Sequence, residues 1–324
     1  MNVLKYIDYE FIKLLYKRSE LSQRNISKIL NCSLGKTNET LKILKELNYL
    51  NEDNSLTNLG TNLIKKNKSA IILAAGQGIR MIPINNNVPK AMLEINGEIL
   101  IERIIKQLLE ADIYDITIVV GFMKEEFDYL IDRYHVRLVV NREYQEKNNL
   151  HSLNIVKDKI SNTYIIPGDL YFYENPFLDN EIQSWYMLEN RISKHSNVLC
   201  NTKNEIIKTK KDGLKMIGLA FINNQDSSYL KKRLEYLDDG MHDSYFWEET
   251  LYQKNKMFIY GKIVDTNYVD EINTYEELRN IDDHSAHLNN DTLSLIANVF
   301  ETNIEQIKNI KSLKKGMTNR SFLF

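Results

Sequence analysis

Cysteine is scarce in this chain: Cys32 and Cys200 are the two cysteines among 324 residues. They fall in segments that we assign to different domains, so neither a disulfide framework nor a cysteine-based metal site is expected. Such sparse use of cysteine fits a reducing compartment, and we predict that the protein is cytoplasmic.

Long apolar runs and a strong net charge are also missing. No run approaches the 18 or so apolar residues of a membrane span. Asp8 and Glu10 interrupt the apolar N-terminus, which argues against a signal peptide. A formal net charge of −2 gives no general attraction to nucleic acid or membranes. With 43% hydrophobic and 27% charged residues, the composition is that of a globular protein of about two domains.

A glycine-containing loop after a short apolar run is the most informative segment. The run Ile71–Leu73 predicts a buried parallel strand. Gly76 and Gly78 then allow a sharp turn and bring backbone amides close to a ligand, where they can meet phosphate oxygens. Arg80 and Lys90 add positive charge that can neutralise a polyphosphate. Together these features predict a nucleoside triphosphate site.

Two commoner glycine loops do not fit this sequence. The dinucleotide fingerprint requires a third glycine where Met81 stands. The P-loop pattern fails at Gly35–Thr37, because the earlier glycine that it requires is Leu30.

Residues 69–281 alternate predicted strands with predicted helices. This alternation predicts an α/β fold of Rossmann-like type, a mostly parallel sheet with helices on both faces. Ligands of open α/β sheets lie at the carboxyl ends of strands, so the glycine loop and Asp169 are expected to converge. The predicted strands are 70–73, 116–120, 136–140 and 163–166, and the predicted helices are 99–111, 124–133 and 152–159.

Residues 1–66 form a separate predicted unit of three helices followed by two short strands around a polar turn at 49–57. This order resembles a winged helix-turn-helix, with 56–60 as the returning strand of the wing. The unit contains 11 Lys+Arg and 7 Asp+Glu, a net charge of +4. DNA is therefore a candidate partner through residues 1–66, and protein docking or homodimerisation is the alternative.

The pattern LAAGxGxR followed by Pro89–Lys90 resembles the signature of sugar-phosphate and aminoalcohol-phosphate nucleotidyltransferases. Residues 70 to about 279 resemble, more narrowly, the phosphocholine cytidylyltransferases of bacteria. The segments that carry this resemblance are 89–97, 121–130, 148–153, Gly168–Asp169, Trp247–Glu248 and Glu271–Asn273.

The resemblance implies a reaction and its residues. A phosphate oxygen of phosphocholine attacks the α-phosphorus of CTP, and pyrophosphate leaves. Arg80, Lys90 and Asp169 are the implied catalytic residues, and Asp169 also matches a Mg²⁺ ligand of the family. A Gly-Asp pair also occurs in simple turns, but its place after an apolar strand favours the catalytic role. The residues implied to hold the nucleotide are Ala74, Ala75, Gly76, Gly78, Asn149 and Ser152.

This chain departs from the family at the second metal ligand. An aspartate of the family corresponds to Asn273, whose amide oxygen can coordinate Mg²⁺ but brings no negative charge. We therefore expect weaker metal binding at Asp169 and Asn273, unless Asp265, Asp270 or Glu271 compensates.

The family holds the choline headgroup with aromatic rings and a carboxylate. Trp247, Glu248 and Tyr171 are the candidates here, although a tryptophan is also a common core residue. A second tryptophan expected near 196–198 is absent, and Trp185 is the possible substitute.

The isolated histidines suggest little chemistry. We expect His151 to lie along the nucleotide site, and His284 and His287 to be exposed in a polar connector.

Two further interpretations stay open. The enzyme could use another nucleotide with a sugar or aminoalcohol phosphate, or the chain could be a winged-helix regulator whose degenerate nucleotidyltransferase domain is a sensor.

Residues 282–324 are predicted to be a linker followed by the start of a choline kinase-like domain, because 310–324 resemble the first strands and phosphate loop of such a kinase. An unrelated tail is the alternative, and no kinase activity is predicted.

Overall fold

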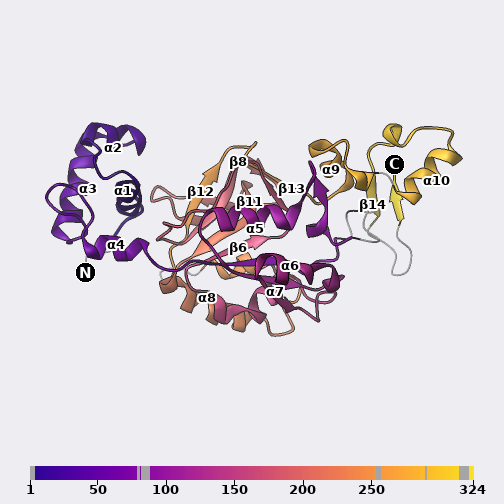
Figure 1. Cartoon of the computed structure of the whole chain (residues 1–324), viewed down its shortest axis with the longest axis horizontal. Helices are drawn as coiled ribbons and strands as arrows, with labels where there is room; N and C mark the ends of the chain where they lie inside the picture. Colours follow the sequence, from indigo (N-terminus) through magenta and orange to yellow (C-terminus); the bar gives the residue numbers. More distant parts are fainter. Residues whose placement is uncertain (1–3, 79–80, 82–87, 253–256, 289, 314–320) are drawn as a thin grey trace.

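The computed structural model describes residues 4–78, 81, 88–252, 257–288, 290–313 and 321–324. Three parts follow one another along its longest axis: an N-terminal helical unit, a central α/β unit and a C-terminal segment (Figure 1). No helix among the described residues is long and apolar enough to cross a membrane.

A seven-stranded sheet forms the central unit, in the order β12-β8-β11-β6-β1-β4-β5. Parallel pairing joins β1 to β4 and β6, β4 to β5, and β12 to β8, whereas β11 runs antiparallel to β6 and β8. The predicted mostly parallel sheet is therefore confirmed. Its strands are β1 Ser69–Ala74, β4 Asp115–Val120, β5 Arg137–Val140, β6 Thr163–Pro167, β8 Trp185–Ser193, β11 Gly213–Ile222 and β12 Tyr260–Val264.

Helices cover both faces of this sheet, as the alternating pattern predicted. α5 (Leu100–Glu110) and α6 (Tyr129–Tyr134) pack on one face, in a core that contains Ile104, Leu108 and Leu130. α7 (Asn149–Ile155) and α8 (Asn224–Leu237) pack on the other face. Each of the single helices predicted at 124–133 and 152–159 is instead an α-helix next to a short 3-10 helix: η3 (Lys124–Phe127) precedes α6, and η4 (Lys157–Lys159) follows α7.

Short antiparallel strand pairs lie outside the seven-stranded sheet. β7 (Leu170–Phe172) pairs antiparallel with β13 (Val269–Glu271) and so joins two distant parts of the chain. The other pairs are β2 Glu94–Ile95 with β3 Glu98–Ile99, β9 Val198–Cys200 with β10 Ile206–Lys208, and β14 Lys311–Leu313 with β15 Ser321–Leu323.

The N-terminal unit contains the three predicted helices, α1 (Tyr6–Lys17), α2 (Gln23–Ile29) and α3 (Leu34–Glu46). Ser22 and Ser33 cap α2 and α3 by accepting backbone N–H groups. Among the described residues, the two short strands predicted around the turn at 49–57 are reduced to one antiparallel bridge between Leu50 and Leu56. The expected return strand at 56–60 instead begins a helix, because Thr57 caps α4 (Asn58–Ile64).

α1 docks the helical unit onto the central unit beside β12. Lys13 Nζ lies 3.0 Å from Glu181, and Gln183 donates to Glu10 at 2.9 Å. The rings of Tyr6 and Tyr260 lie 5.1 Å apart. Ile182 of the central unit joins the core of the helical unit.

The segment after residue 281 packs on the central unit and is not an extended connector. Leu293 and Ala297 of α10 (Asp291–Val299) share a buried cluster with Tyr275 and Leu278 of α9 (Tyr275–Ile281). Asn290 caps α10, and its side chain accepts the backbone N–H of Leu293 at 3.0 Å. Two short 3-10 helices, η6 (Ala286–Leu288) and η7 (Ile304–Gln306), flank α10.

His287 contradicts the expectation that it is exposed. Its Nε2 accepts the backbone N–H of Glu94 at 3.1 Å, and the ring is half-buried. His284 is exposed, as expected. The glycine of the kinase-like phosphate loop, at 316, lies outside the described residues.

Candidate active site

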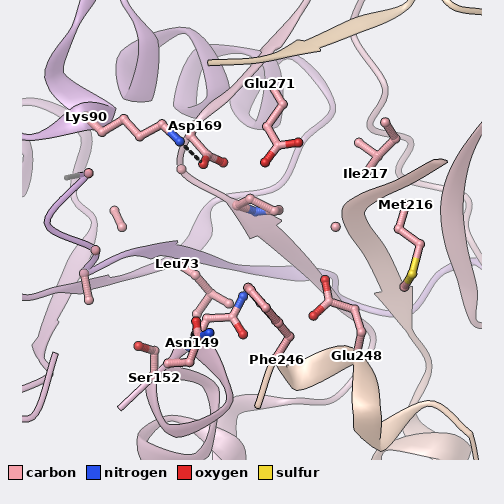
Figure 2. Close-up of a pocket in the computed structure, with 18 of the residues that line it drawn as sticks. Leu73, Lys90, Asn149, Ser152, Asp169, Met216, Ile217, Phe246, Glu248 and Glu271 are labelled. Carbon is pink, nitrogen blue, oxygen red and sulfur yellow. Dashed lines mark hydrogen bonds and ion pairs between the residues drawn. The ribbon is translucent and has the colours of Figure 1, made fainter. Parts of the chain in front are cut away.

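A cavity of about 770 Å³ opens at the carboxyl ends of β1 and β6. The loop after β1 contributes Gly76 and Gly78, and the loop after β6 contributes Gly168 and Asp169. The bulged part of β11 and the short helix η5 (Trp247–Thr250) form the opposite wall (Figure 2). The predicted convergence of the glycine loop and Asp169 is thus present in the fold.

Glycine suits three positions of this cavity for different structural reasons. A Cβ added to Gly76 would meet no atom within 4 Å, because this residue faces open space. Gly78 has a positive φ of 62°, which favours glycine. A Cβ at Gly168 would lie 3.0 Å from that of Ala74, so glycine permits close approach of the two loops. Arg80, the predicted cationic partner of this loop, lies outside the described residues.

Lys90 connects two of the predicted site residues. This lysine begins η2 (Lys90–Met92), and its Nζ lies 2.5 Å from Asp169 and 2.7 Å from the side-chain oxygen of Asn273. Figure 2 shows the Lys90 side chain reaching Asp169 along the cavity wall. Residues separated by 79 and 183 positions therefore meet at one ammonium group.

Glu271 is a second carboxylate on this wall. It lies across from Leu170 in the β7–β13 pair, and the N–H of Ile272 donates to the carbonyl oxygen of Asp169 at 3.0 Å. Burial and the negative charge of Asp169 raise the pKa of Glu271 above its ordinary value. Asp169 and Glu271 are oxygen ligands of the type that Mg²⁺ uses together with substrate phosphates. Within the described part of the chain, no group of three or more His, Cys, Asp or Glu residues forms a metal cage.

Asn149 and Ser152 line the cavity at the start of α7, as predicted. Asn149 accepts the backbone N–H of Trp247 at 2.9 Å, and Ser152 accepts from Asn141 at 3.0 Å. Ala74 and Ala75, at the end of β1, also line it. These four nucleotide candidates, together with Gly76 and Gly78, therefore line one cavity.

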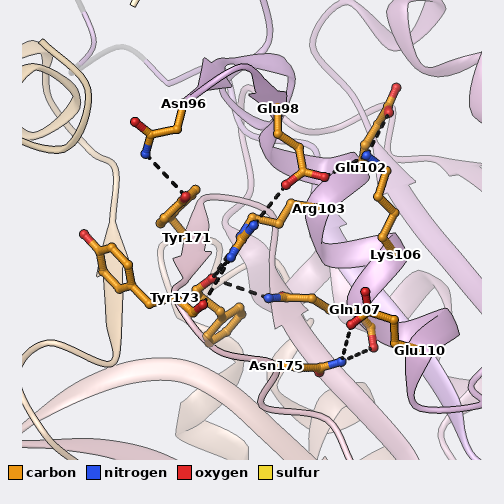
Figure 3. A network of polar contacts seen from close by, with 11 residues as sticks. Asn96, Glu98, Glu102, Arg103, Lys106, Gln107, Glu110, Tyr171, Tyr173 and Asn175 are labelled. Carbon is orange, nitrogen blue, oxygen red and sulfur yellow. Dashed lines mark hydrogen bonds and ion pairs between the residues drawn. The ribbon is translucent and has the colours of Figure 1, made fainter. Parts of the chain in front are cut away.

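Two of the three predicted headgroup residues lie away from the cavity. Trp247 is fully buried in the core, with its ring 6.1 Å from that of Tyr186. Tyr171 is buried in another cluster, under the guanidinium of Arg103, and its hydroxyl accepts from Asn96 (Figure 3). These contacts give both rings structural roles, as the core interpretation of Trp247 suggested.

Glu248 does line the cavity, and its carboxylate points into it (Figure 2). Oε1 accepts from the hydroxyl of Tyr186 at 3.2 Å, whereas Oε2 has no hydrogen-bond partner among the described residues. Burial raises the pKa of Glu248 to about 7, and the negative charges of Glu271 and Glu249 act in the same direction.

Aromatic residues that no sequence motif identified surround Glu248. Phe246 is 57% exposed and projects into the cavity beside Glu248 (Figure 2). Tyr144, Tyr186 and Tyr252 line the same space. Phe246 is next to Trp247 in sequence, and no periodic pattern in this segment indicates which of the two rings faces the cavity. Tyr186 belongs to β8, where it lies opposite Ala220 of β11.

Two other sequence predictions are corrected by the packing. His151 does not line the cavity; its Nδ1 lies 2.7 Å from Asp238, at the end of α8. Trp185 does not replace the missing tryptophan, because it packs in the core against Tyr164. At the 196–198 segment, the cavity-lining residue is Asn197.

Comparison with known proteins agrees with this geometry. Residues 70–205 match the family described as the MobA-like NTP transferase domain. Choline-phosphate cytidylyltransferase of Streptococcus pneumoniae is 32% identical over 230 residues, which cover 66% of this chain and 96% of that protein. 2-Aminoethylphosphonate cytidylyltransferase of Lancefieldella rimae is 34% identical over 204 residues, which cover 59% and 81%.

A solved structure of CTP:phosphocholine cytidylyltransferase from Streptococcus pneumoniae superimposes with a TM-score of 0.62 and 30% identity. The match covers 67% of this chain and 99% of that structure. Sequence, fold and cavity therefore agree: this protein is a nucleotidyltransferase and belongs to the family of the choline-phosphate cytidylyltransferases.

Proposed function

We propose that the protein transfers the cytidylyl group of CTP to phosphocholine. A phosphate oxygen of the acceptor forms a bond to the α-phosphorus, the bond from that phosphorus to the bridging oxygen breaks, and pyrophosphate leaves. The observation that supports this function is that the two ends of one cavity carry different charged groups. Cationic and carboxylate groups stand at one end, and an unpaired carboxylate among aromatic rings stands at the other.

The triphosphate end consists of the Gly76–Gly78 loop, Lys90 and Asp169. Amides of the loop and the ammonium of Lys90 are suited to phosphate oxygens. Arg80 is proposed to act here on the basis of the family signature. Mg²⁺ fits Asp169 and Glu271, because it is commonly held by one or two carboxylates plus substrate phosphates. When bound, the ion neutralises charge that develops on the phosphates.

The acceptor end consists of Glu248, Phe246 and Tyr252. An ammonium group beside Glu248 pairs with a half-buried carboxylate whose Oε2 has no hydrogen-bond partner among the described residues. The faces of Phe246 and Tyr252 add attraction for a quaternary ammonium. We propose these two aromatic residues in place of Trp247 and Tyr171, which lie in the core.

Pyrophosphate release tests this function. CTP and Mg²⁺ are combined in turn with phosphocholine, phosphoethanolamine, 2-aminoethylphosphonate and a sugar 1-phosphate. We expect phosphocholine to give the highest kcat/KM and Asp169→Asn to abolish release with every acceptor. Glu248→Gln should raise the KM for phosphocholine by about tenfold or more, since it removes a charge-assisted contact. Binding of CTP without release for any acceptor would favour a sensor domain.

A second proposal concerns the helical unit, which we propose binds DNA through α3. The supporting observation is that α3 lies on the side of the unit away from the central sheet (Figure 1). Lys36 and Lys42 are exposed enough to reach phosphates, but each lies near a glutamate, at 3.1 Å from Glu39 and 3.9 Å from Glu46. Such surface pairs contribute only about 0–1 kcal/mol, so phosphates can replace them.

Fluorescence anisotropy with duplex DNA, titrated with salt, tests this proposal. Affinity should fall as salt rises, and Lys36→Gln with Lys42→Gln should reduce the slope of that dependence. No binding at low salt would contradict DNA recognition. A concentration-dependent dimer in sedimentation, without DNA binding, would favour the docking role.

A further inference from the structure

A buried polar segment leads into β8 and takes its contacts from the helical unit. Glu181, Gln183 and Ser184 are each 3% exposed or less, and buried polar groups are costly unless they are paired. α1 supplies partners for the first two residues: Lys13 lies 3.0 Å from Glu181, and Glu10 accepts from Gln183 at 2.9 Å. The proposed nucleotidyl transfer uses none of these groups.

The residue between the two polar partners of α1 is apolar and enters the core of the helical unit. Ile182 belongs to the same buried cluster as Phe11 and Leu15 of α1. The three consecutive residues 181–183 are therefore all held by the helical unit. Without α1 they would leave a buried carboxylate, a buried amide and an apolar side chain without these partners, so the course of the segment depends on docking.

β8 connects this segment to the acceptor end of the cavity. Tyr186 follows the segment by three residues, and its hydroxyl donates to Glu248 at 3.2 Å. The Glu248 carboxylate in turn points into the cavity (Figure 2). The ammonium of Lys262 lies 3.8 Å from Glu181 and 4.3 Å from the centre of the Trp185 ring. One buried group of charges therefore contacts both α1 and the residue next to Tyr186.

We propose that the docked helical unit is part of the acceptor site. Lys13 and Glu10 are positioning residues: they hold the 181–183 segment and so keep β8 on the course that brings Tyr186 to Glu248. This inference rests on the proposed function, because it takes Glu248 as the carboxylate that meets the ammonium of phosphocholine.

The triphosphate end is built from other segments. Lys90 and Asp169 contact each other, and they belong to η2 and to the loop after β6. Loss of docking is therefore expected to weaken phosphocholine binding and to leave CTP binding unchanged. A general loss of folded protein would instead lower kcat and leave both KM values as they are.

Steady-state kinetics of pyrophosphate release tests the inference, with the full-length protein, CTP, Mg²⁺ and phosphocholine. Lys13→Met should raise the KM for phosphocholine at least about fivefold and change the KM for CTP by less than about twofold. Lys13→Arg should keep both values near those of the unsubstituted protein, because it restores the positive charge beside Glu181. Lys17→Met is the matched control, since this exposed lysine lies on the same helix.

A milder variant covers the case in which Lys13→Met unfolds at the assay temperature. Glu10→Ala removes the acceptor of Gln183 and should raise the KM for phosphocholine about twofold or more. An unchanged KM for phosphocholine in a variant that is folded at the assay temperature, or an equal rise in the KM for both substrates, would overturn the inference alone. If the unsubstituted protein releases no pyrophosphate with phosphocholine, the proposed function fails, and the inference fails with it.

Discussion

At the scale of single residues, Lys90 connects distant parts of the chain at the active site. Its ammonium contacts a carboxylate and an amide from two distant segments, within 2.7 Å of each. Lys90→Met should lower kcat/KM for CTP by about 10²–10³-fold, the range typical for loss of one electrostatic contact to a transition state. Pyrophosphate release measures this effect.

Lys124→Met supplies the control for Lys90. Lys124 is exposed and pairs only with the exposed Glu125 at 2.8 Å among the contacts that the structure describes. Its substitution should leave the rate unchanged. A Lys90→Met enzyme that retains more than about a third of the rate would contradict the role of this ammonium.

The charge of Glu248 serves the proposed function but lowers the stability of the folded protein. Burial raises its pKa to about 7 from an ordinary value near 4.5. The folded protein therefore binds more protons than the unfolded chain between these values, so this residue makes stability fall as pH rises through that range. Glu248→Gln should raise the unfolding temperature at pH 8 and change it little at pH 4.

Thermal unfolding at the two pH values checks this prediction, with Glu249→Gln as the matched neighbour. The side chain of Glu249 pairs with Lys208 at 2.7 Å, so its replacement should not stabilise the protein. An unfolding temperature of Glu248→Gln that is lower at pH 8 than at pH 4, relative to the unsubstituted protein, would show that the carboxylate is not destabilising.

At the scale of elements, substitutions of two glycines in the cavity wall should affect different properties, stability in one case and CTP binding in the other. Gly218 lies in the bulged part of β11 with φ of 95°, and an added Cβ would lie 2.5 Å from Pro167. Gly218→Ala should therefore lower the free energy of unfolding by about 2 kcal/mol. Gly76→Ala should leave stability unchanged, because its Cβ meets open space, but should weaken CTP binding by occupying that space.

Urea unfolding and CTP titration of both variants distinguish the two effects. Equal loss of stability in Gly76→Ala would mean that the loop after β1 is packed more tightly than the structure indicates. Unchanged CTP affinity in that variant would place the nucleotide elsewhere in the cavity.

At the scale of the whole molecule, a buried ion pair joins the helical and central units. Glu181 is 3% exposed and lies 3.0 Å from Lys13, with Lys262 at 3.8 Å. Burial alone would raise the pKa of Glu181, but these two cations outweigh it and hold the pKa below its ordinary value. Lys13→Met should lower the free energy of unfolding by about 3 kcal/mol, because it removes the nearer of the two cations that compensate this buried charge.

Two probes of unfolding test whether the units unfold together. Both tryptophans, Trp185 and Trp247, belong to the central unit, whereas far-UV circular dichroism also reports the helical unit. The two transitions should coincide and shift together in Lys13→Met, while the exposed Lys17→Met should have little effect. Separate transitions, with only the dichroism altered by Lys13→Met, would mean that the units are energetically independent.

The sequence by itself determined the fold class and most of the triphosphate end of the cavity. Short apolar runs and the glycines after β1 are local signals, and local patterns specify strands, turns and the chemistry that follows them. Lys90 and Asp169 could be identified because each belongs to a contiguous motif. The return strand expected at 56–60 is wrong for a local reason as well, since Thr57 caps a helix there.

Only the tertiary structure decided which residues surround the acceptor end and how the second carboxylate is supplied. Phe246 and Trp247 are neighbours of similar chemistry, yet one faces the cavity and the other is fully buried. Glu271 reaches Asp169 through strand pairing between segments about a hundred residues apart. Burial, the side to which a loop residue points and long-range pairing depend on packing of the whole chain, and no local pattern encodes them.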